Sequence, residues 1–337
     1  MTAQLPRAER RAMQRALALA ENSGVNRGPN PAVGCVLLDP DGNLLAEGWH
    51  RGPGTAHAEV AALEAAGEAA RGATAVVSLE PCSHHGRTPP CTSALLAAGV
   101  TRVVFGQADP NPDAAGGAGV LRAAGVAVVG PVAADEAWEV NRDWNLAQTL
   151  RRPVVLWKVA ASLDGRITAA DGGSKWITSP ESREQVHQLR AAADAVVTGT
   201  GTALADRPRL TARAPGVTPD VQPLRVVMGL SDLPSDHPLI DAVHLRTRDP
   251  VEALSRLWEL DVRRVMLECG PRLAGAFVEA DLVDRIAWFG APMLLGDRGL
   301  PVMAGGPANL PTARRWRTVA LVQCGPDLRI DLEREET

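Results

Sequence analysis

The stretch "EPCSHHGRTPPC", residues 80 to 91, places two cysteines on either side of an adjacent pair of histidines. Upstream, "HAE" at residues 57 to 59 stands at the start of a helix-like segment. Catalytic zinc sites typically use three protein ligands and keep a fourth position for water. His57, Cys82 and Cys91 supply three suitable donors. These residues therefore predict a zinc site.

Glu59 has a different predicted role, because residues two apart on a helix point to nearly opposite sides. At a helix start, the Glu59 carboxylate can reach the metal-bound water and move its proton. Zinc lowers the pKa of such water to about 7. In zinc-dependent nucleobase deaminases, a glutamate beside the ligand is the acid and base. The pattern favours hydrolytic deamination, and a closed zinc clip with His84 or His85 as fourth ligand is the alternative.

The spacing of the two cysteines separates this sequence from most nucleic-acid deaminases. Their second motif is P-C-x-x-C, whereas eight residues lie between Cys82 and Cys91. The net charge is −4, with 35 basic and 39 acidic residues, and the sequence has no tyrosine. A nucleic-acid surface should show a basic excess and aromatic stacking platforms. The sequence therefore argues against a nucleic-acid partner.

Four motifs carry a family resemblance: "PNPAVGCV" from residue 29, "HAEVAAL" from residue 57, the 80 to 91 stretch, and "DPNP" from residue 109. With them, the chain resembles the deaminase half of the bifunctional riboflavin-biosynthesis deaminase/reductase family. The resemblance implies zinc on His57, Cys82 and Cys91, with Glu59 as proton carrier. The residues that it implies for substrate binding are Asn30, His50, His84, Arg87, Asp109 and Asn111. For Asn30 and Asn111, a turn-forming role beside prolines is the alternative.

The run from Lys158 to Arg213, together with "ECGPRLAG" from residue 268, is similar to the reductase half of the same family. That half resembles dihydrofolate reductase in fold and uses NADPH. The implied cofactor-binding residues are Ala160, Trp176, Thr202, Asp206, Gly270, Pro271, Arg272, Leu273, Ala274, Gly275 and Ala276. The implied substrate-binding residues are Ser174, Arg190, Leu210, Arg213 and Glu268. The family's V-D-S-like strand end is replaced here by "VVMGLSDL", so Ser231 receives no role.

Without the resemblance, this second block indicates less. Glycine-bearing turns follow its strands and could place amides toward a phosphate, but a packing role for those glycines is equally consistent. Of the 35 basic residues only Lys158 and Lys175 are lysines. Lysine can lose its proton when buried, so Lys158, with Glu268, is a candidate for acid catalysis or substrate orientation. A strand-end surface lysine is the alternative, and Lys175 is expected to be a solvated loop charge.

The elements that must position these residues alternate between helix and strand. Residues 6 to 21 predict a helix, Asp41-Gly42 a hairpin turn, and residues 135 to 149 a closing helix. Later, "DAVVTGTGT" predicts a strand and Ser179 the cap of a helix. Alternation of this kind predicts α/β layers with a largely parallel core. The resemblance implies a cytidine-deaminase-like three-layer domain, 1–147, followed by a dihydrofolate-reductase-like α/β domain, 148–337.

We therefore expect a zinc- and NADPH-dependent bifunctional enzyme of riboflavin synthesis. The substrate would be a small pyrimidine ribonucleotide. The alternative is a zinc deaminase acting on another nucleotide or on RNA, with an inactive or sensing C-terminal domain. No apolar run of membrane-spanning length occurs. Five cysteines do not suggest a disulfide framework, and Cys35, Cys269 and Cys324 are expected to be buried in strand-like runs. A cytoplasmic setting is expected, and the family implies a homodimer.

Overall fold

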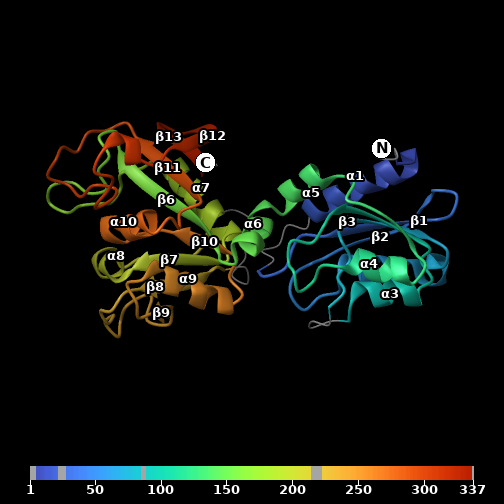
Figure 1. Ribbon diagram of the computed structural model, residues 1–337. Coiled ribbons are helices and arrows are strands. Elements are labelled where there is room, and N and C mark those ends of the chain that lie inside the picture. Colours follow the sequence, from blue (N-terminus) through green and yellow to red (C-terminus); the bar gives the residue numbers. More distant parts are fainter. Residues whose placement is uncertain (1–4, 22–27, 85–88, 214–221, 336–337) are drawn as a thin grey trace. The chain divides into compact units, whose positions relative to one another are not determined.

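A computed structural model of the protein describes residues 5–21, 28–84, 89–213 and 222–335 (Figure 1). Contacts within the chain divide it into two compact units, Met1–Arg151 and Arg152–Thr337. They are called here the N-terminal unit and the C-terminal unit. In the described ranges, none of the helices combines the length and the apolar character that crossing a bilayer requires.

The N-terminal unit is built on a five-stranded sheet with the order β2-β1-β3-β4-β5. Its strands are β1 (Gly34–Leu38), β2 (Leu44–Trp49), β3 (Thr74–Leu79), β4 (Arg102–Gln107) and β5 (Ala127–Val129). The predicted hairpin is confirmed, because β1 pairs antiparallel with β2 and Gly42 has a φ of 86°. β1 is also antiparallel to β3, while β3, β4 and β5 are mutually parallel. The prediction of a largely parallel core is therefore right only for β3 to β5.

Helices cover both faces of this sheet. On one face α1 (Arg7–Glu21) packs with α5 (Ala134–Val140), as predicted for the first helix. The helices of the other face are α2 (Ala58–Ala66), α3 (Cys91–Ala97) and α4 (Gly117–Ala123), with a short 3₁₀ turn, η1 (Gly67–Ala70), after α2. Alternate strand residues serve the two faces. Val36 and Val76 pack under α1, whereas Cys35 and Val77 pack under α2. The unit is a three-layer α/β sandwich.

Gly48 fixes how the metal-site helix meets the sheet. A Cβ atom at Gly48 would lie 2.3 Å from the Ala58 carbonyl oxygen and 2.4 Å from the Ala62 nitrogen. Real Cβ atoms do not approach backbone this closely, so only glycine lets α2 rest directly on β2. This contact sets the position of the α2 N-terminus, where His57 is the N-cap residue.

The single closing helix predicted for residues 135 to 149 is wrong. The segment is two helices, α5 and α6 (Arg142–Leu150), which meet at Asn141. Asn141 leaves helical geometry, with φ −116° and ψ 21°, and uses its side chain elsewhere. Its Oδ1 accepts from the Ala32 nitrogen at 2.7 Å and its Nδ2 donates to the Ala32 oxygen at 2.8 Å. The helix breaks where this side chain is needed to hold the chain around residue 32.

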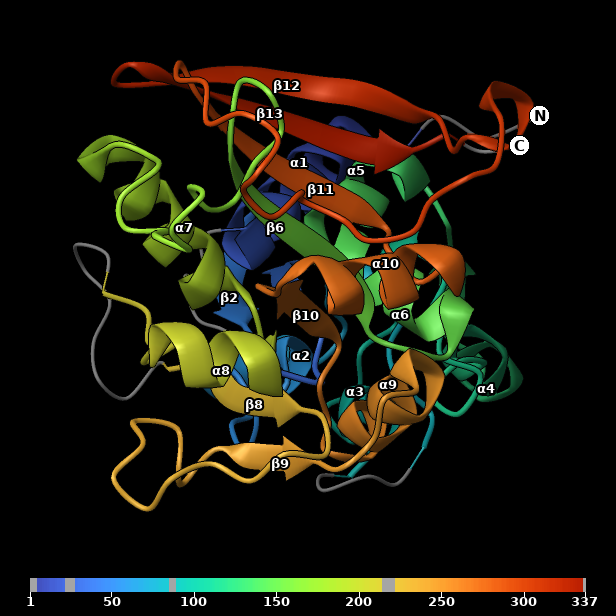
Figure 2. The ribbon, with the colours of Figure 1, turned by 90° about the vertical axis from the view of Figure 1, so that its left-hand side faces the viewer.

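The C-terminal unit contains an eight-stranded sheet with the order β12-β13-β11-β6-β10-β7-β8-β9 (Figure 2). The strands are β6 (Val154–Ser162), β7 (Ala195–Gly199), β8 (Leu224–Met228), β9 (Val243–Leu245), β10 (Arg264–Leu267), β11 (Arg285–Ala291), β12 (Trp316–Cys324) and β13 (Asp327–Arg334). From β11 to β9 every neighbouring pair is parallel. β13 and β12 add an antiparallel edge. The predicted α/β class is confirmed.

Helices cover both faces of this sheet as well. They are α7 (Pro180–Ala192) and α8 (Thr200–Asp206) on one face and α9 (Pro250–Glu259) and α10 (Pro271–Glu279) on the other, with a short turn η2 (Leu310–Thr312) (Figure 2). Ser179 caps α7 as predicted, accepting from the Ser182 nitrogen at 3.2 Å. The strand predicted to continue through Thr202 ends at Gly199, because α8 begins at once.

Candidate active sites

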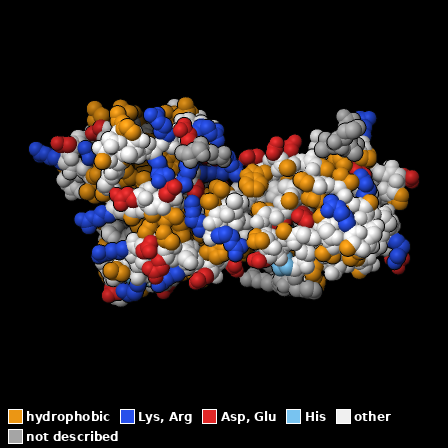
Figure 3. All heavy atoms as spheres, viewed as in Figure 1, with side chains coloured by type: hydrophobic (Ala, Val, Ile, Leu, Met, Phe, Trp, Pro, Cys, Tyr) orange, Lys and Arg blue, Asp and Glu red, His pale blue; other side chains and the backbone are white. Residues whose placement is uncertain are grey.

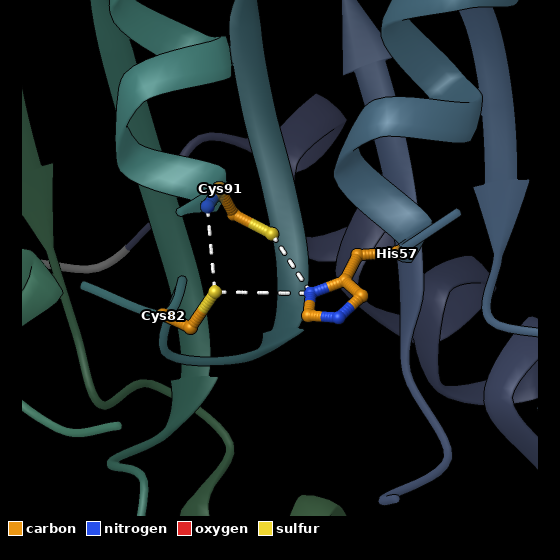
Figure 4. A group of neighbouring side chains, drawn as sticks. All are labelled: His57, Cys82 and Cys91. Carbon is orange, nitrogen blue, oxygen red and sulfur yellow. Dashed lines mark hydrogen bonds between the residues drawn. The ribbon is translucent and has the colours of Figure 1, made fainter. Parts of the chain in front are cut away.

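Three donor atoms from distant parts of the N-terminal unit meet at one point. Nδ1 of His57 lies 3.1 Å from Sγ of Cys91 and 3.7 Å from Sγ of Cys82, and the three atoms lie within 4.8 Å of one another. Figure 4 shows the imidazole facing both sulfurs, with Cys91 at the start of α3 and Cys82 on the loop that follows β3. The structure therefore brings the three predicted ligands together.

The spacing of these donors fits zinc. Zn–S bonds of about 2.3 Å and Zn–N bonds of about 2.0 Å at tetrahedral angles hold nitrogen and sulfur about 3.5 Å apart, between the two observed separations. Hydrogen bonding from Cys91, together with His57, lowers the pKa of the Cys82 thiol to about 4, against the opposing effect of burial. The site therefore favours a thiolate at Cys82, the form that binds zinc, whereas the hydrogen bond to Cys82 and burial raise the pKa of the Cys91 thiol.

Glu59 lies inside the protein beside this cluster. The residue is 3% exposed and stands in the first turn of α2, two residues after His57. Burial raises the pKa of its carboxyl group, and the Cys82 thiolate raises it further. Its carboxylate also accepts a hydrogen bond from the Cys91 thiol, which lowers the pKa of Glu59 by a smaller amount. A carboxyl group of raised pKa next to a metal site can both accept and return a proton.

The loop before β1 places Asn30 against His50. Nδ2 of Asn30 lies 2.8 Å from Nε2 of His50, and Nδ1 of His50 lies 3.1 Å from the Ala56 oxygen. Since the amide NH₂ group donates, Nε2 accepts and the proton of His50 sits on Nδ1. The His50 and His57 rings meet edge to face at 5.4 Å. The predicted substrate residues Asn30 and His50 thus adjoin the metal cluster.

Asp109 and Asn111 share a loop after β4. The Asn111 nitrogen donates to Oδ1 of Asp109 at 2.8 Å, and burial raises the pKa of Asp109 to about 7, with Glu80 adding to the rise. Glu80, which received no role from the sequence, holds this loop by accepting from the Asp109 nitrogen and from the Ala118 nitrogen. His84 is exposed. Arg87 and His85 lie outside the described residues.

The C-terminal unit contains a cavity of about 1290 Å³. Its wall follows the carboxyl ends of neighbouring parallel strands, where ligands bind in open α/β sheets. Every residue predicted for substrate binding in this unit lines it: Ser174, Arg190, Leu210, Arg213 and Glu268. The residues predicted for the cofactor that line it are Ala160, Trp176, Thr202, Asp206, Gly270, Pro271, Arg272, Leu273 and Ala276. One cavity therefore holds almost the entire predicted second site.

Glu268 links the two buried cations of this cavity. Its carboxylate accepts two hydrogen bonds from Arg190, at 2.5 and 2.9 Å, and lies 3.8 Å from Nζ of Lys158. Burial would raise the pKa of Glu268, but Arg190 and then Lys158 outweigh it and lower that pKa to about 2. Burial lowers the pKa of Lys158, opposed by Glu268 and assisted by Arg190. Lys158 is thus a buried ammonium rather than a surface charge.

Other contacts shape the same wall. Oγ of Ser174 donates to Asp206 at 3.2 Å, and NH2 of Arg213 lies 3.3 Å from Nε2 of His187. Leu210 is buried with a φ of 53°. A left-handed conformation is costly for leucine, and such residues cluster at functional sites. The guanidinium of Arg183 lies 4.5 Å from the Trp176 ring centroid and stacks on that exposed ring.

The cavity fits a dinucleotide such as NADPH. A Cβ atom at Gly229, whose φ is 137°, would lie 2.5 Å from Oγ1 of Thr200, and one at Gly270 would lie 3.2 Å from Oγ1 of Thr202. Because glycine has no Cβ atom, the backbone at these two positions and the hydroxyl groups of Thr200 and Thr202 stay accessible to a ligand. Oγ1 of Thr198 is buried without a hydrogen-bond partner in the described part of the chain. A buried hydroxyl of this kind is expected to be satisfied by a bound group.

Two residues of the predicted cofactor stretch do not line the cavity. Ala274 is fully buried in the core, and a Cβ atom at Gly275 would lie 2.1 Å from the Ala304 oxygen. Both are on the faces of α10 that pack against protein, since residues 271 to 276 span more than one helical turn. Gly275 is needed for that close packing.

The cavity is also lined by residues for which no role was predicted. Polar and charged examples are Thr198, Ser231, Thr247 and Arg248, and Cys269 is another. Cys269 was expected in a buried strand-like run, but β10 ends at Leu267 and Cys269 lies in the cavity wall. Burial raises its thiol pKa. Cys35 and Cys324 are buried as expected. The signal that could have located Arg248 is its position just after a strand of a parallel sheet.

Comparisons with known families match both units. Residues 6–107 match the family described as the cytidine and deoxycytidylate deaminase zinc-binding region. Residues 153–330 match the RibD C-terminal domain family. The first match contains the three clustered donors and the second contains the cavity.

Curated proteins and solved structures agree along the length of the chain. The chain is 46% identical to a riboflavin biosynthesis protein RibD from Mycobacterium tuberculosis, covering 90% of this chain and 91% of that protein. It is 38% identical to the RibD of Escherichia coli, covering 95% and 98%. The Acinetobacter baumannii RibD structure superposes with a TM-score of 0.89 at 34% identity, covering 98% and 99% of the two chains. A Thermotoga maritima deaminase/reductase structure gives 0.80 at 31% identity, covering 97% and 99%.

Proposed function

The chain belongs to the RibD family of riboflavin biosynthesis proteins, and from this premise we propose how its residues divide the work of the two reactions. It is a bifunctional enzyme, a zinc-dependent deaminase and an NADPH-dependent reductase. We assign the deaminase to residues 1–147 and the reductase to residues 148–337. The deaminase substrate is 2,5-diamino-6-ribosylamino-4(3H)-pyrimidinone 5′-phosphate.

In the deaminase, His57, Cys82 and Cys91 hold the metal, which when bound makes water a nucleophile at neutral pH. Glu59 takes a proton from that water as its oxygen adds to the ring carbon that bears the 2-amino group. Glu59 then delivers the proton to the amine, the carbon–nitrogen bond breaks, and ammonia leaves. Its burial and raised pKa suit a group that must change protonation twice in one turnover.

The substrate in this unit is held by groups around the cluster. Asn30, whose amide is oriented by His50, faces the edge of the pyrimidine. Asp109 and Asn111 form hydrogen bonds with the pyrimidine ring and the ribose, from the loop whose backbone is hydrogen-bonded to Glu80. His84 and Arg87 supply donors for the 5′-phosphate, a role suited to cationic and imidazole groups.

In the reductase, NADPH held by the cavity residues around Gly270 would supply a hydride for C1′ of the ribosyl group. The bond between C1′ and the ring oxygen breaks with its electron pair on oxygen, and Lys158 gives that oxygen a proton. The lowered pKa of Lys158 makes its ammonium a better acid. Glu268 and Arg190 orient Lys158 and the sugar, while Ser174, Leu210 and Arg213 shape the substrate side of the cavity.

One observation carries this assignment: a zinc-type donor cluster with a buried glutamate occurs in the same chain as a cavity holding a buried Lys158–Glu268–Arg190 group. A deaminase with an inactive C-terminal domain would not require that second group. The described basic and acidic side chains on the face seen in Figure 3 are interspersed rather than gathered into a basic stripe, as suits a small-molecule substrate. We propose a homodimer and a cytoplasmic location, in keeping with the family.

The direct test is incubation of the purified chain with the diaminopyrimidine nucleotide, with and without NADPH. Without NADPH, we expect ammonia and the deaminated ribosyl product. With NADPH, we expect NADPH oxidation and the ribityl product. Deamination of RNA or of an unrelated nucleotide, with no turnover of this substrate, would contradict the assignment. Deamination without NADPH oxidation would contradict the reductase half alone.

A further inference from the structure

One end of the reductase cavity holds a cation that no other group in the described chain neutralises. Arg248 follows β9, is exposed and lines the cavity, yet forms no ion pair or hydrogen bond with any described residue. Its neighbour Arg246 differs, because Arg246 pairs with Asp232 and does not line the cavity. The cavity thus contains an arginine left available for an external anion.

Two acidic side chains of the loops after β8 and β9 are engaged elsewhere, because Asp232 pairs with Arg246 and Asp249 accepts from the Val251 nitrogen at the start of α9. Among the described residues, the acidic ones that line the cavity are Asp206 and Glu268. Asp206 accepts from Ser174, and Glu268 is bound by Arg190. Neither belongs to the loops after β8 and β9. In dinucleotide sites an acidic residue on the ribose 2′-hydroxyl favours NAD, whereas an arginine accommodates the 2′-phosphate of NADP.

The loop after β8 brings a second polar group to the same end. Met228 and Leu245 are paired across β8 and β9, and the Gly229 nitrogen donates to the Leu245 oxygen at 3.0 Å. Ser231 and Arg248 each follow this paired position by three residues, and both line the cavity. The loop that carries Arg248 is held by Thr247, whose Oγ1 donates to Glu252 and accepts from the Asp249 nitrogen.

The distance of Arg248 from Lys158 across the sheet suits the length of an extended NADPH molecule. Lys158, at the proposed hydride site, lies on β6, and four strand steps lead through β10, β7 and β8 to β9. At about 4.8 Å per step, the loop after β9 lies about 19 Å from the Lys158 strand. The glycine-bearing turns at Gly199 and Gly270 lie between them. An extended dinucleotide reaching from Lys158 over those turns would place its adenosine ribose at this end.

We propose that Arg248, with the hydroxyl of Ser231, binds the 2′-phosphate of NADPH and so sets the preference of this reductase for NADPH over NADH. This inference rests on the proposed reductase function. Arg248 supplies charge-assisted hydrogen bonds to a dianionic phosphate, and Thr247 is a positioning residue for its loop. Arg248 makes no contact with the reacting atoms.

The test uses the full chain and two small probes, adenosine 2′,5′-bisphosphate and adenosine 5′-monophosphate, measured by titration calorimetry. The probes differ only in the 2′-phosphate. We expect the wild type to prefer the bisphosphate. Arg248→Ala should weaken bisphosphate binding by about 10- to 100-fold and leave monophosphate binding unchanged. Arg248→Lys should recover part of the loss. Arg246→Ala is the matched control and should change neither affinity.

Equal weakening of both probes by Arg248→Ala would overturn the proposal, because Arg248 would then bind a part common to both cofactors. Unchanged binding of both probes would also overturn it. Steady-state kinetics provide a second readout, in which Arg248→Ala should raise KM for NADPH without raising KM for NADH. A wild-type chain that binds neither probe nor NADPH would instead remove the reductase assignment on which the inference rests.

Discussion

Replacing Glu268 by glutamine tests the buried charge group of the reductase. The side chains of Glu268, Lys158 and Arg190 are 12%, 17% and 12% exposed. Glu268→Gln keeps the shape of the side chain but removes the negative charge that pairs with both Lys158 and Arg190. Breaking a buried pair by removing one partner typically costs about 3–5 kcal/mol, because the remaining charge stays buried.

The pKa of Glu268 gives a consistent magnitude. Lowering it from the ordinary value of 4.5 to about 2 corresponds to about 3 kcal/mol of folding free energy. Since the folded pKa is depressed, this stability is fully present above pH 4.5 and is lost as pH falls toward 2. The lowered pKa of Lys158 points the other way, because its buried ammonium is only partly compensated. The contribution of Glu268 dominates, because its two hydrogen bonds to Arg190 are short and direct.

The assay is thermal unfolding of the full chain, with NADPH oxidation followed in parallel. A loss of about 3 kcal/mol should lower the transition of the C-terminal unit by roughly 6–12 °C at pH 7. Between pH 4.5 and 2 the variant should lose less stability than the wild type. At pH 7 its reductase turnover should be at least about tenfold lower than that of the wild type. Asp232→Asn breaks an exposed pair and is the control, with an expected cost of about 0–1 kcal/mol. A cost for Glu268→Gln no larger than this control would refute the reasoning.

Two further substitutions test how the deaminase site is positioned. Gly48→Ala should destabilise the N-terminal unit by about 1–3 kcal/mol and weaken zinc retention, because the new Cβ meets the backbone of α2; Gly119→Ala, where a Cβ meets nothing, should be neutral or stabilising in the same unfolding assay. Asn141→Leu should leave zinc content at one per chain and raise KM for the pyrimidine nucleotide about tenfold, because two hydrogen bonds that hold the Asn30 loop are lost. Unchanged zinc retention in Gly48→Ala, or an unchanged KM in Asn141→Leu, would contradict this account.

The sequence predicted the parts of the fold that depend on local pattern. The first helix, the hairpin at Asp41-Gly42 and the Ser179 cap each have a short-range physical cause, and each is confirmed. The break at Asn141 was not predicted, because it depends on a partner more than a hundred positions away at Ala32. Helix α9 and the edge pair β12 and β13 were not predicted either.

The candidate sites show the same limit. Residue type and order sufficed to group His57, Cys82 and Cys91, because few chemistries use that set. Glu80 and Arg248 could not be identified in this way. Glu80 acts by accepting a hydrogen bond from the backbone of a loop 29 positions later. Arg248 lines the cavity because β9 joins the same sheet as β6, four strands away, and this strand order is a property of the whole fold.

The role of Glu59 as proton carrier is tested most directly by measuring zinc content together with ammonia release in Glu59→Gln. Glutamine preserves the size of the side chain and cannot exchange the proton. We expect the variant to keep one zinc per chain, bound by His57, Cys82 and Cys91, while its rate of ammonia release falls by at least about a hundredfold. Ammonia release at the wild-type rate from a zinc-loaded variant would contradict this role.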